Sequence, residues 1–165
     1  MYKPIIRTLL AALAIAVASI AHAQAPRGSI EFKNIAEVER EVTGADGKVE
    51  KKREPVSKAV PGSIVIYTSI FKNISTKGVG NININNPIPA NTTLVPASAY
   101  GEGMDISFSA DGGKTWATAD KVRVKDADGK ERPAGISEFT HIKWSLRGEL
   151  ASGKQGEAGF RVVVN

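Results

Sequence analysis

The 165-residue chain contains no cysteine and only two histidines, His22 and His141. Without cysteine the protein has no disulfides, no thiolate metal ligands and no thiol for the lipid anchor of a bacterial lipoprotein. Aromatic residues make up 6% of the chain, and no segment after residue 23 has the run of ~20 apolar residues that a membrane-spanning helix needs. The fold must therefore be held by a core of aliphatic side chains and a few rings.

The segment of residues 1–23 has the features of a secretory signal peptide. Two cations precede an apolar run over residues 9–20, and Ala21 and Ala23 are the small residues that signal peptidase requires before its cut. We expect cleavage after Ala23, with Ala25 as the second choice. A retained membrane anchor is the alternative, but the apolar run is shorter than a spanning helix of ~20 residues.

Cleavage would remove Lys3 and Arg7 and no acidic residue, which lowers the net charge from +5 to about +3. A weak basic excess with both signs interspersed is ordinary for an exported domain and does not indicate an anionic partner. We therefore expect an exported protein, periplasmic or extracellular, with no membrane span after cleavage and no nucleic acid partner.

Residues 24–59 are predicted to form an amino-terminal strand and hairpin extension. From Ser29 onward, apolar residues recur with a period of two, which is typical of a half-buried strand. One parity carries Ile30, Phe32, Ala36, Val38 and Val42, and the other carries Glu31, Lys33, Glu37, Glu39 and Glu41. The first set is expected to face the core and the second set the solvent.

A tight reversal is predicted at Asp46 and Gly47, because glycine and, less easily, aspartate accept the positive φ of a hairpin turn. The cationic return arm then sets Lys51 or Lys52 opposite Glu41. Cross-strand ion pairs keep an exposed ribbon soluble, which is the favoured interpretation of this charged face. A docking patch is the alternative.

Residues 60–165 are predicted to form one β-sandwich domain. Val60–Ser75 carries β-branched and aromatic residues on both faces, as a central strand does. In Asn81–Pro89, Ile82 and Ile84 alternate with asparagines, and two prolines end the strand. Further strands are predicted at Met104–Phe108, Lys121–Lys125, His141–Leu146 and Gly159–Val164. Many short strands separated by turn residues, without a helical repeat, indicate an all-β sandwich.

The order of these motifs resembles the bacterial conserved-repeat family called domain of unknown function 11. The matching stretches are PGSIVIYTSIFKN, NININNPIPANTTLV, ISFSADGGKTW, IKWSL and LASGKQGEAGFRVVV, which span about Val60 to Asn165. The positions of the family pattern are Pro61, Gly62, Tyr67, Asn73, Asn86, Pro89 and Gly153, with the closing strand at Phe160–Val164. The resemblance implies an immunoglobulin-like antiparallel β-sandwich of an exported or surface protein.

Two features depart from the family pattern: Asn86 stands where the family has aspartate, and the chain carries one copy of a unit that the family often repeats. A single unit does not form a long surface stalk. The roles that follow for individual residues are structural. Asn73 can bind the local backbone where its strand ends, and Tyr67 and Trp144 are predicted core residues because large aromatics dominate sandwich interiors.

Catalytic constellations are scarce in the sequence. After cleavage His141 would be the only histidine, so one chain could not supply two imidazoles to a zinc ion. Nucleophile-elbow and phosphate-binding glycine motifs do not occur. We predict a protein that is not an enzyme, with no catalytic residues, no cofactor and no metal.

Two binding alternatives stay open at lower weight. Asp111, Asp126, Asp128 and Glu131 lie in loops and could hold calcium, although the EF-hand spacing is not met and Asp-Gly also makes turns. Trp116 and Tyr100 are candidate ligand contacts, because flat exposed rings stack on sugars. Partial burial of both rings under loops is the favoured interpretation.

The sequence thus predicts a non-catalytic module of the envelope or extracellular space, structural or engaged in protein interaction, whose partner is an envelope or extracellular protein or polymer. Contacts are expected in the loops Ser75–Gly80, Tyr100–Gly103 and Asp126–Gly135, because a rigid sandwich presents its loops for binding. The alternative is a carbohydrate-binding accessory protein.

Overall fold

The computed structural model describes residues 28–44 and 46–165, so the predicted signal peptide lies outside the described residues. The elements in chain order are β1 (Ile30–Thr43), β2 (Val49–Pro55), β3 (Ile64–Asn73), β4 (Val79–Gly80), β5 (Asn83–Pro87), β6 (Thr92–Leu94), β7 (Tyr100–Gly101), β8 (Met104–Ser109), β9 (Arg123–Lys125), β10 (Glu131–Pro133), the 3-10 helix η1 (Ile136–Glu138), β11 (His141–Leu146), β12 (Glu149–Leu150) and β13 (Gln155–Val164). In this part of the chain no helix is long and apolar enough to span a membrane.

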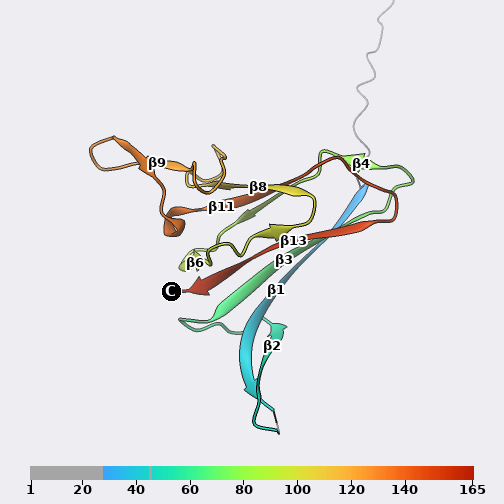
Figure 1. Cartoon of the computed structure of the whole chain (residues 1–165). Helices are drawn as coiled ribbons and strands as arrows, with labels where there is room; N and C mark the ends of the chain where they lie inside the picture. Colours follow the sequence, from blue (N-terminus) through green and yellow to red (C-terminus); the bar gives the residue numbers. More distant parts are fainter. Residues whose placement is uncertain (1–27, 45) are drawn as a thin grey trace, which may run out of the picture.

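The strands form two antiparallel sheets that face each other, as the prediction of an all-β sandwich requires (Figure 1). The main sheet has the order β2-β1-β3-β13-β6, with β7 also paired to β13, and the second sheet has the order β5-β11-β8. Two small ribbons, β12-β4 and β10-β9, lie outside this pair of sheets. Strands β8 and β11 coincide closely with predicted strands, whereas β13 begins at Gln155, earlier than the predicted start at Gly159.

The core lies between the two sheets and contains side chains from both. Trp144 of β11 is 0% exposed and its ring lies 6.0 Å from that of Phe160 in β13. Tyr67 of β3 stacks on the same Phe160 ring at 5.2 Å and is half-buried. The prediction of Trp144 as a core residue is confirmed, and Tyr67 packs at the margin of that core.

The amide-rich segment around β5 has the predicted two faces. Ile82 and Ile84 are buried, whereas Asn81, Asn83 and Asn85 are exposed. Asn86 continues this alternation and points inward between the sheets, where its amide donates a hydrogen bond to Ser69 Oγ at 3.0 Å. This residue therefore ties β5 of the second sheet to β3 of the main sheet.

Strand β1 belongs to the main sheet along most of its length, because Ile30–Glu39 pairs with β3. Only the tip of the β1–β2 hairpin extends beyond the sandwich (Figure 1). Glu41 lies opposite Lys51 in the register, as predicted. Lys51 nevertheless makes its ion pair with Glu39, at 3.0 Å, and this bond lowers the pKa of the Glu39 carboxyl.

The expectation that Phe32 is buried is wrong. Its ring faces the core side of the sheet and lies 6.2 Å from the ring of Phe71, but the residue is 49% exposed. Because β2 pairs with β1 only from Glu37 onward, the first half of β1 is an edge of the main sheet. A side chain that points toward the core from an edge strand can therefore stay exposed, because the opposite sheet does not extend over it.

Two turns show why the family-pattern positions 62 and 153 are glycines. Gly62 has φ +83° in the turn closed by Ser63 N–H donating to the Val60 carbonyl, with Pro61 before it, as in a type II turn. Gly153 has φ +72°, and its N–H donates to the Asn73 carbonyl at 2.9 Å. Both glycines therefore occupy left-handed backbone that other residues adopt with strain.

Candidate functional site

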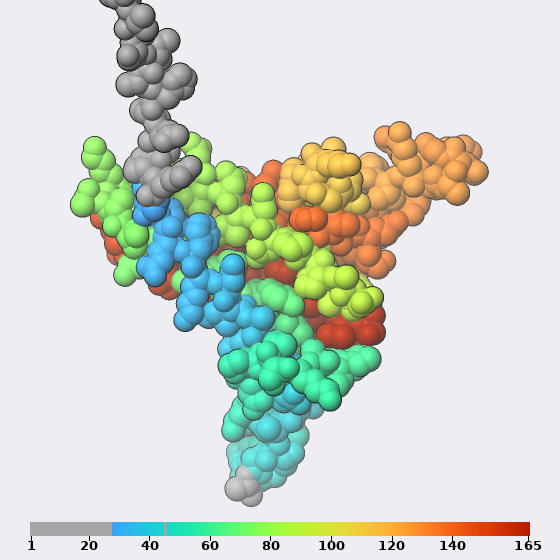
Figure 2. All heavy atoms as spheres, turned by 180° about the vertical axis from the view of Figure 1, so that it is seen from behind, coloured from blue at the N-terminus to red at the C-terminus, as the bar shows by residue number. Residues whose placement is uncertain are grey.

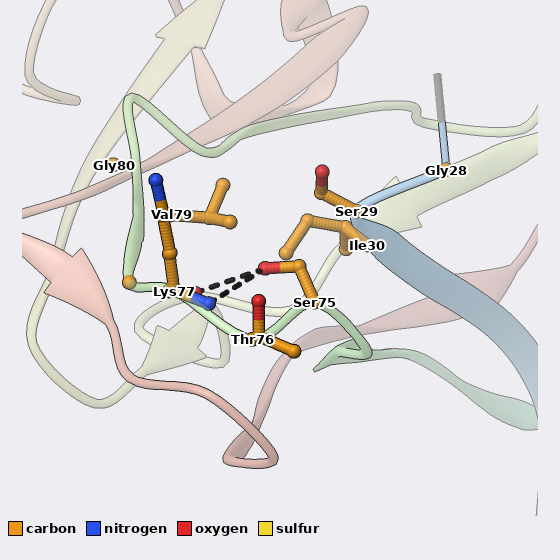
Figure 3. Close-up of a pocket in the computed structure, with 9 residues that line it drawn as sticks. Gly28, Ser29, Ile30, Ser75, Thr76, Lys77, Val79 and Gly80 are labelled. Carbon is orange, nitrogen blue, oxygen red and sulfur yellow. Dashed lines mark hydrogen bonds between the residues drawn. The ribbon is translucent and has the colours of Figure 1, made fainter. Parts of the chain in front are cut away.

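A hollow of about 780 Å³ opens where β1 begins, and we call it the β1–β4 hollow (Figure 3). One wall is the start of β1, Gly28–Ile30, and the other is Ser75–Gly80, the chain between β3 and the end of β4. This second wall is one of the loops predicted to make contacts. Sequence alternation placed Ile30 in a core and gave no sign of the hollow, because the two walls are more than forty residues apart in the chain.

The loop wall is fixed in shape by Asn73, whose side chain is fully buried. Its amide nitrogen donates to the carbonyls of Lys77 and Leu150, both at 2.7 Å. Its amide oxygen accepts from Ser75 N–H at 2.9 Å and from Ser75 Oγ at 2.7 Å. Ser75 Oγ also lies 2.9 Å from the Lys77 carbonyl oxygen, a contact drawn as a dashed line in Figure 3, so its single hydroxyl hydrogen is shared between that oxygen and Asn73 Oδ1. The predicted binding of local backbone by Asn73 is confirmed.

The surface of the hollow combines apolar and polar groups. Ile30 and Val79 are half-buried and provide aliphatic surface from the two walls. Hydroxyl groups come from Ser75 and Thr76, and the exposed Lys77 side chain runs beside Val79 (Figure 3). Such a surface can hold an aliphatic side chain while a few polar groups fix its orientation.

A second, smaller hollow of about 190 Å³ lies further along the same side, between Asn34 of β1, Ser69 of β3 and Asn86 of β5. Ser69 Oγ donates to Asn34 Oδ1 at 2.8 Å and accepts from Asn86 Nδ2 at 3.0 Å. Pro89, another residue of the family pattern, also lines it. The chain of three polar side chains crosses from one sheet to the other and holds this side of the sandwich rigid.

The two candidate sugar-stacking rings lie on opposite outer faces of the sandwich. Trp116 packs edge-on to His141, on the outer face of the second sheet, and Lys143 Nζ lies 4.6 Å from the centre of its ring. Tyr100 is 38% exposed and packs over Gly159 of the main sheet. The two rings therefore form no common platform, and Lys143 lies over one face of the Trp116 ring.

The carboxylates of the loops serve their own turns. Asp111 accepts hydrogen bonds from Ser109 Oγ at 2.6 Å and from the backbone and side chain of Thr115, and these bonds lower the pKa of its carboxyl. Asp126 Oδ1 accepts from the N–H groups of Asp128 and Lys130. Within residues 28–44 and 46–165, no three His, Asp or Glu side chains are grouped so that they could hold a metal ion.

His141 is half-buried on β11, and its Nδ1 lies 3.1 Å from Thr140 Oγ1. Its other close neighbour is the Trp116 ring. An ion pair at η1 has a structural role: Arg132 donates two hydrogen bonds of 2.8 Å to Glu138, which also accepts from Gly135 N–H. The Arg132 bonds are the main reason that the pKa of Glu138 falls to about 2.

Comparison with known proteins gives no relative from which a function could be transferred. No protein-family model matches the chain, and no match was found among curated proteins or solved structures. The resemblance to the conserved-repeat family therefore stays a prediction. The candidate site with the most defined geometry is the β1–β4 hollow.

Proposed function

We propose that the protein is a non-catalytic, exported binding module, and that its β1–β4 hollow receives part of a partner protein of the envelope or extracellular space. The observation that carries this proposal is the fixed loop wall Ser75–Gly80. Asn73 holds it from behind with three hydrogen bonds, to Lys77 and Ser75, and a fourth bond ties Asn73 to the Leu150 carbonyl. A wall that is already ordered loses little conformational entropy when it binds.

The size and lining of the hollow support this function. Its volume of about 780 Å³ lies within the range of ~300–1,000 Å³ typical of binding pockets. Ile30 and Val79 offer apolar contact, and Thr76 and Lys77 stand at an accessible rim. The signal-peptide features of residues 1–23 support export, since a leader of this kind is removed during secretion.

A protein partner fits the hollow better than a glycan does. Sugars are held by flat rings and planar polar side chains, whereas none of the described residues that line the β1–β4 hollow is aromatic. The rings suggested for that purpose, Trp116 and Tyr100, lie on opposite faces of the sandwich. The family that the motifs resemble is one of immunoglobulin-like modules in exported and surface proteins, which fits a binding role.

The test is site-specific photo-cross-linking in intact cells. A photoreactive residue replaces Thr76 at the rim, and a second protein carries it at Lys130, in the exposed β9–β10 turn. We expect one partner protein to be captured from position 76 and not from position 130. Val79→Asp, which places a charge on the apolar wall, should abolish that capture.

Two further variants check that a loss of capture is specific to the hollow and is not caused by unfolding at Val79, which packs against the core. Val49→Asp makes the same chemical change at a residue that is 62% exposed on the hairpin, and should leave capture intact. Lys77→Glu changes an exposed side chain at the rim and should weaken capture without changing the melting temperature. Unchanged capture in Val79→Asp and Lys77→Glu would refute the site, and saturable quenching of tryptophan fluorescence by a cell-wall glycan would support the carbohydrate alternative instead.

A further inference from the structure

The first half of β1 presents backbone groups to the outside of the main sheet. The Ser29 carbonyl accepts from Ile74 N–H, so Ser29 points toward the β3 side, whereas the Ala36 carbonyl accepts from Val56 N–H on the β2 side. Because the hydrogen-bonding direction alternates along a strand, Ile30, Phe32 and Asn34 also point away from β3. The ladder of β2 covers only Glu37–Thr43, and among the described residues no strand pairs with β1 at these three positions on that side.

This edge lacks the protection that neighbouring edges have. Strand β2 is exposed and charged along most of its length, and Pro55, which has no N–H, stands on its outer side because Val56 points toward β1. The open edge of β5 carries Pro87 in the same way. The β1 edge instead shows Phe32, 49% exposed. Figure 2 shows this half of β1, in blue, uncovered at the surface.

We propose that this edge binds the same edge of a second copy of the chain, so that the two main sheets join into one across a two-fold axis at Phe32. In the antiparallel register centred there, Phe32 of one copy lies opposite Phe32 of the other, Glu31 lies opposite Lys33, and Ile30 lies opposite Asn34. The charges that flank Phe32, Glu31 and Lys33, are thus complementary across the axis.

Charge selects this register over its neighbours. With the axis at Glu31 or at Lys33, two like charges would lie directly opposite each other, which destabilises a strand pair. With the axis at Phe32, both ion pairs join opposite charges. Glu31 and Lys33 are exposed, and both lie on the outer face of the sheet, away from the core.

The backbone geometry fits the same axis. Ile30, Phe32 and Asn34 all point toward the open edge, so their pairs across the axis are hydrogen-bonded pairs, each of which exchanges two N–H···O bonds. The pairing also covers the two Phe32 rings, one against the other. A contact this short is smaller than a permanent interface, so the dimer should form reversibly as the protein concentration rises. This inference goes beyond the proposed function and does not depend on it.

Charge reversal tests the pairing directly. By sedimentation equilibrium, the wild-type protein should shift from monomer to dimer with concentration, and Glu31→Lys or Lys33→Glu alone should raise the dissociation constant at least about tenfold, because each turns two attractive contacts into two repulsive ones. The double variant E31K/K33E restores opposite charges across the axis and should restore dimerisation. Glu41→Lys, with the same charge change on the hairpin beyond the proposed contact, should dimerise like the wild type.

The melting temperature of each variant checks that the monomer is intact, since Glu31 also lies opposite Lys72 in the β1–β3 ladder. A wild-type protein that stays monomeric up to millimolar concentration would overturn the proposal. So would a dimer that survives both single reversals, or one that the double variant fails to recover. None of these sedimentation results depends on the partner captured by cross-linking at Thr76. The dimer proposal and the proposed function can therefore fail independently of each other.

Discussion

Replacing Asn73 with alanine should destabilise the protein by about 3 kcal/mol. The buried side chain makes four hydrogen bonds, with Lys77, Leu150 and twice with Ser75. Each contributes about 1 kcal/mol net, and a partner left unsatisfied in a buried place costs at least as much. We subtract about one of these bonds, because the Lys77 carbonyl keeps its second donor, Ser75 Oγ, at 2.9 Å. The remaining loss is a large share of a total stability of about 5–15 kcal/mol.

The assay is a denaturant titration of wild type and variant with a common slope. Asn83→Ala is the matched control, because Asn83 is exposed and its hydrogen bonds to Asn81 and Ser145 can be replaced by water. We expect the control to lose less than about 1 kcal/mol. Hydrogen exchange at the Ser75 amide should accelerate in Asn73→Ala. If both variants lose the same small amount, Asn73 does not fix the loop wall and the rigid-site argument fails.

Three further outcomes can be measured. Gly159→Ala should lower the stability by about 2 kcal/mol in thermal unfolding, because its Cβ would lie 2.7 Å from the backbone oxygen of Tyr67. The pKa of Glu138 is lowered from 4.5 to about 2 by Arg132, so the pair stabilises the fold above pH 4.5 and this contribution is lost as the pH falls from 4.5 to 2; Glu138→Gln should flatten that part of the stability curve, and an unchanged curve would contradict the assignment. A chelator should leave the melting temperature unchanged, since local donors already occupy the Asp111 oxygens; a clear decrease would reveal a bound cation.

The strands were predictable where the signal is local. In β5 and β11 the two faces follow directly from the alternation of side chains along an extended backbone, which needs no knowledge of the rest of the chain. Ile84 and Trp144 point inward and Asn85 and Lys143 outward for this reason. The turn at Pro61 and Gly62 is equally local, because glycine is needed where φ is +83°.

The exposure of Phe32 and the β1–β4 hollow could not be predicted in this way. The alternation of side chains predicts which face of the sheet a residue lies on. How much of that side chain is buried depends on how far the opposite sheet extends over it. Ile30 and Val79 line the same hollow because of the path that the chain takes from β3 to β4. Neither segment alone has a sequence feature that predicts this. The sequence pattern therefore singled out the loop Ser75–Gly80, which lines the hollow, but not the strand β1 that forms the opposite wall.

The unequal lengths of β1 and β2 connect the two proposals. Strand β1 has 14 residues and β2 has 7, so β2 can cover only the hairpin half of β1 and leaves the other half as an open edge. Ile30 lies in that half, with its side chain in the β1–β4 hollow and its backbone at the edge. A partner in the hollow and a second copy at the edge would thus both touch Ile30, so we expect the two binding events to be energetically coupled. By thermodynamic reciprocity, whatever factor the partner applies to the dimerisation constant, dimerisation applies to the affinity for the partner.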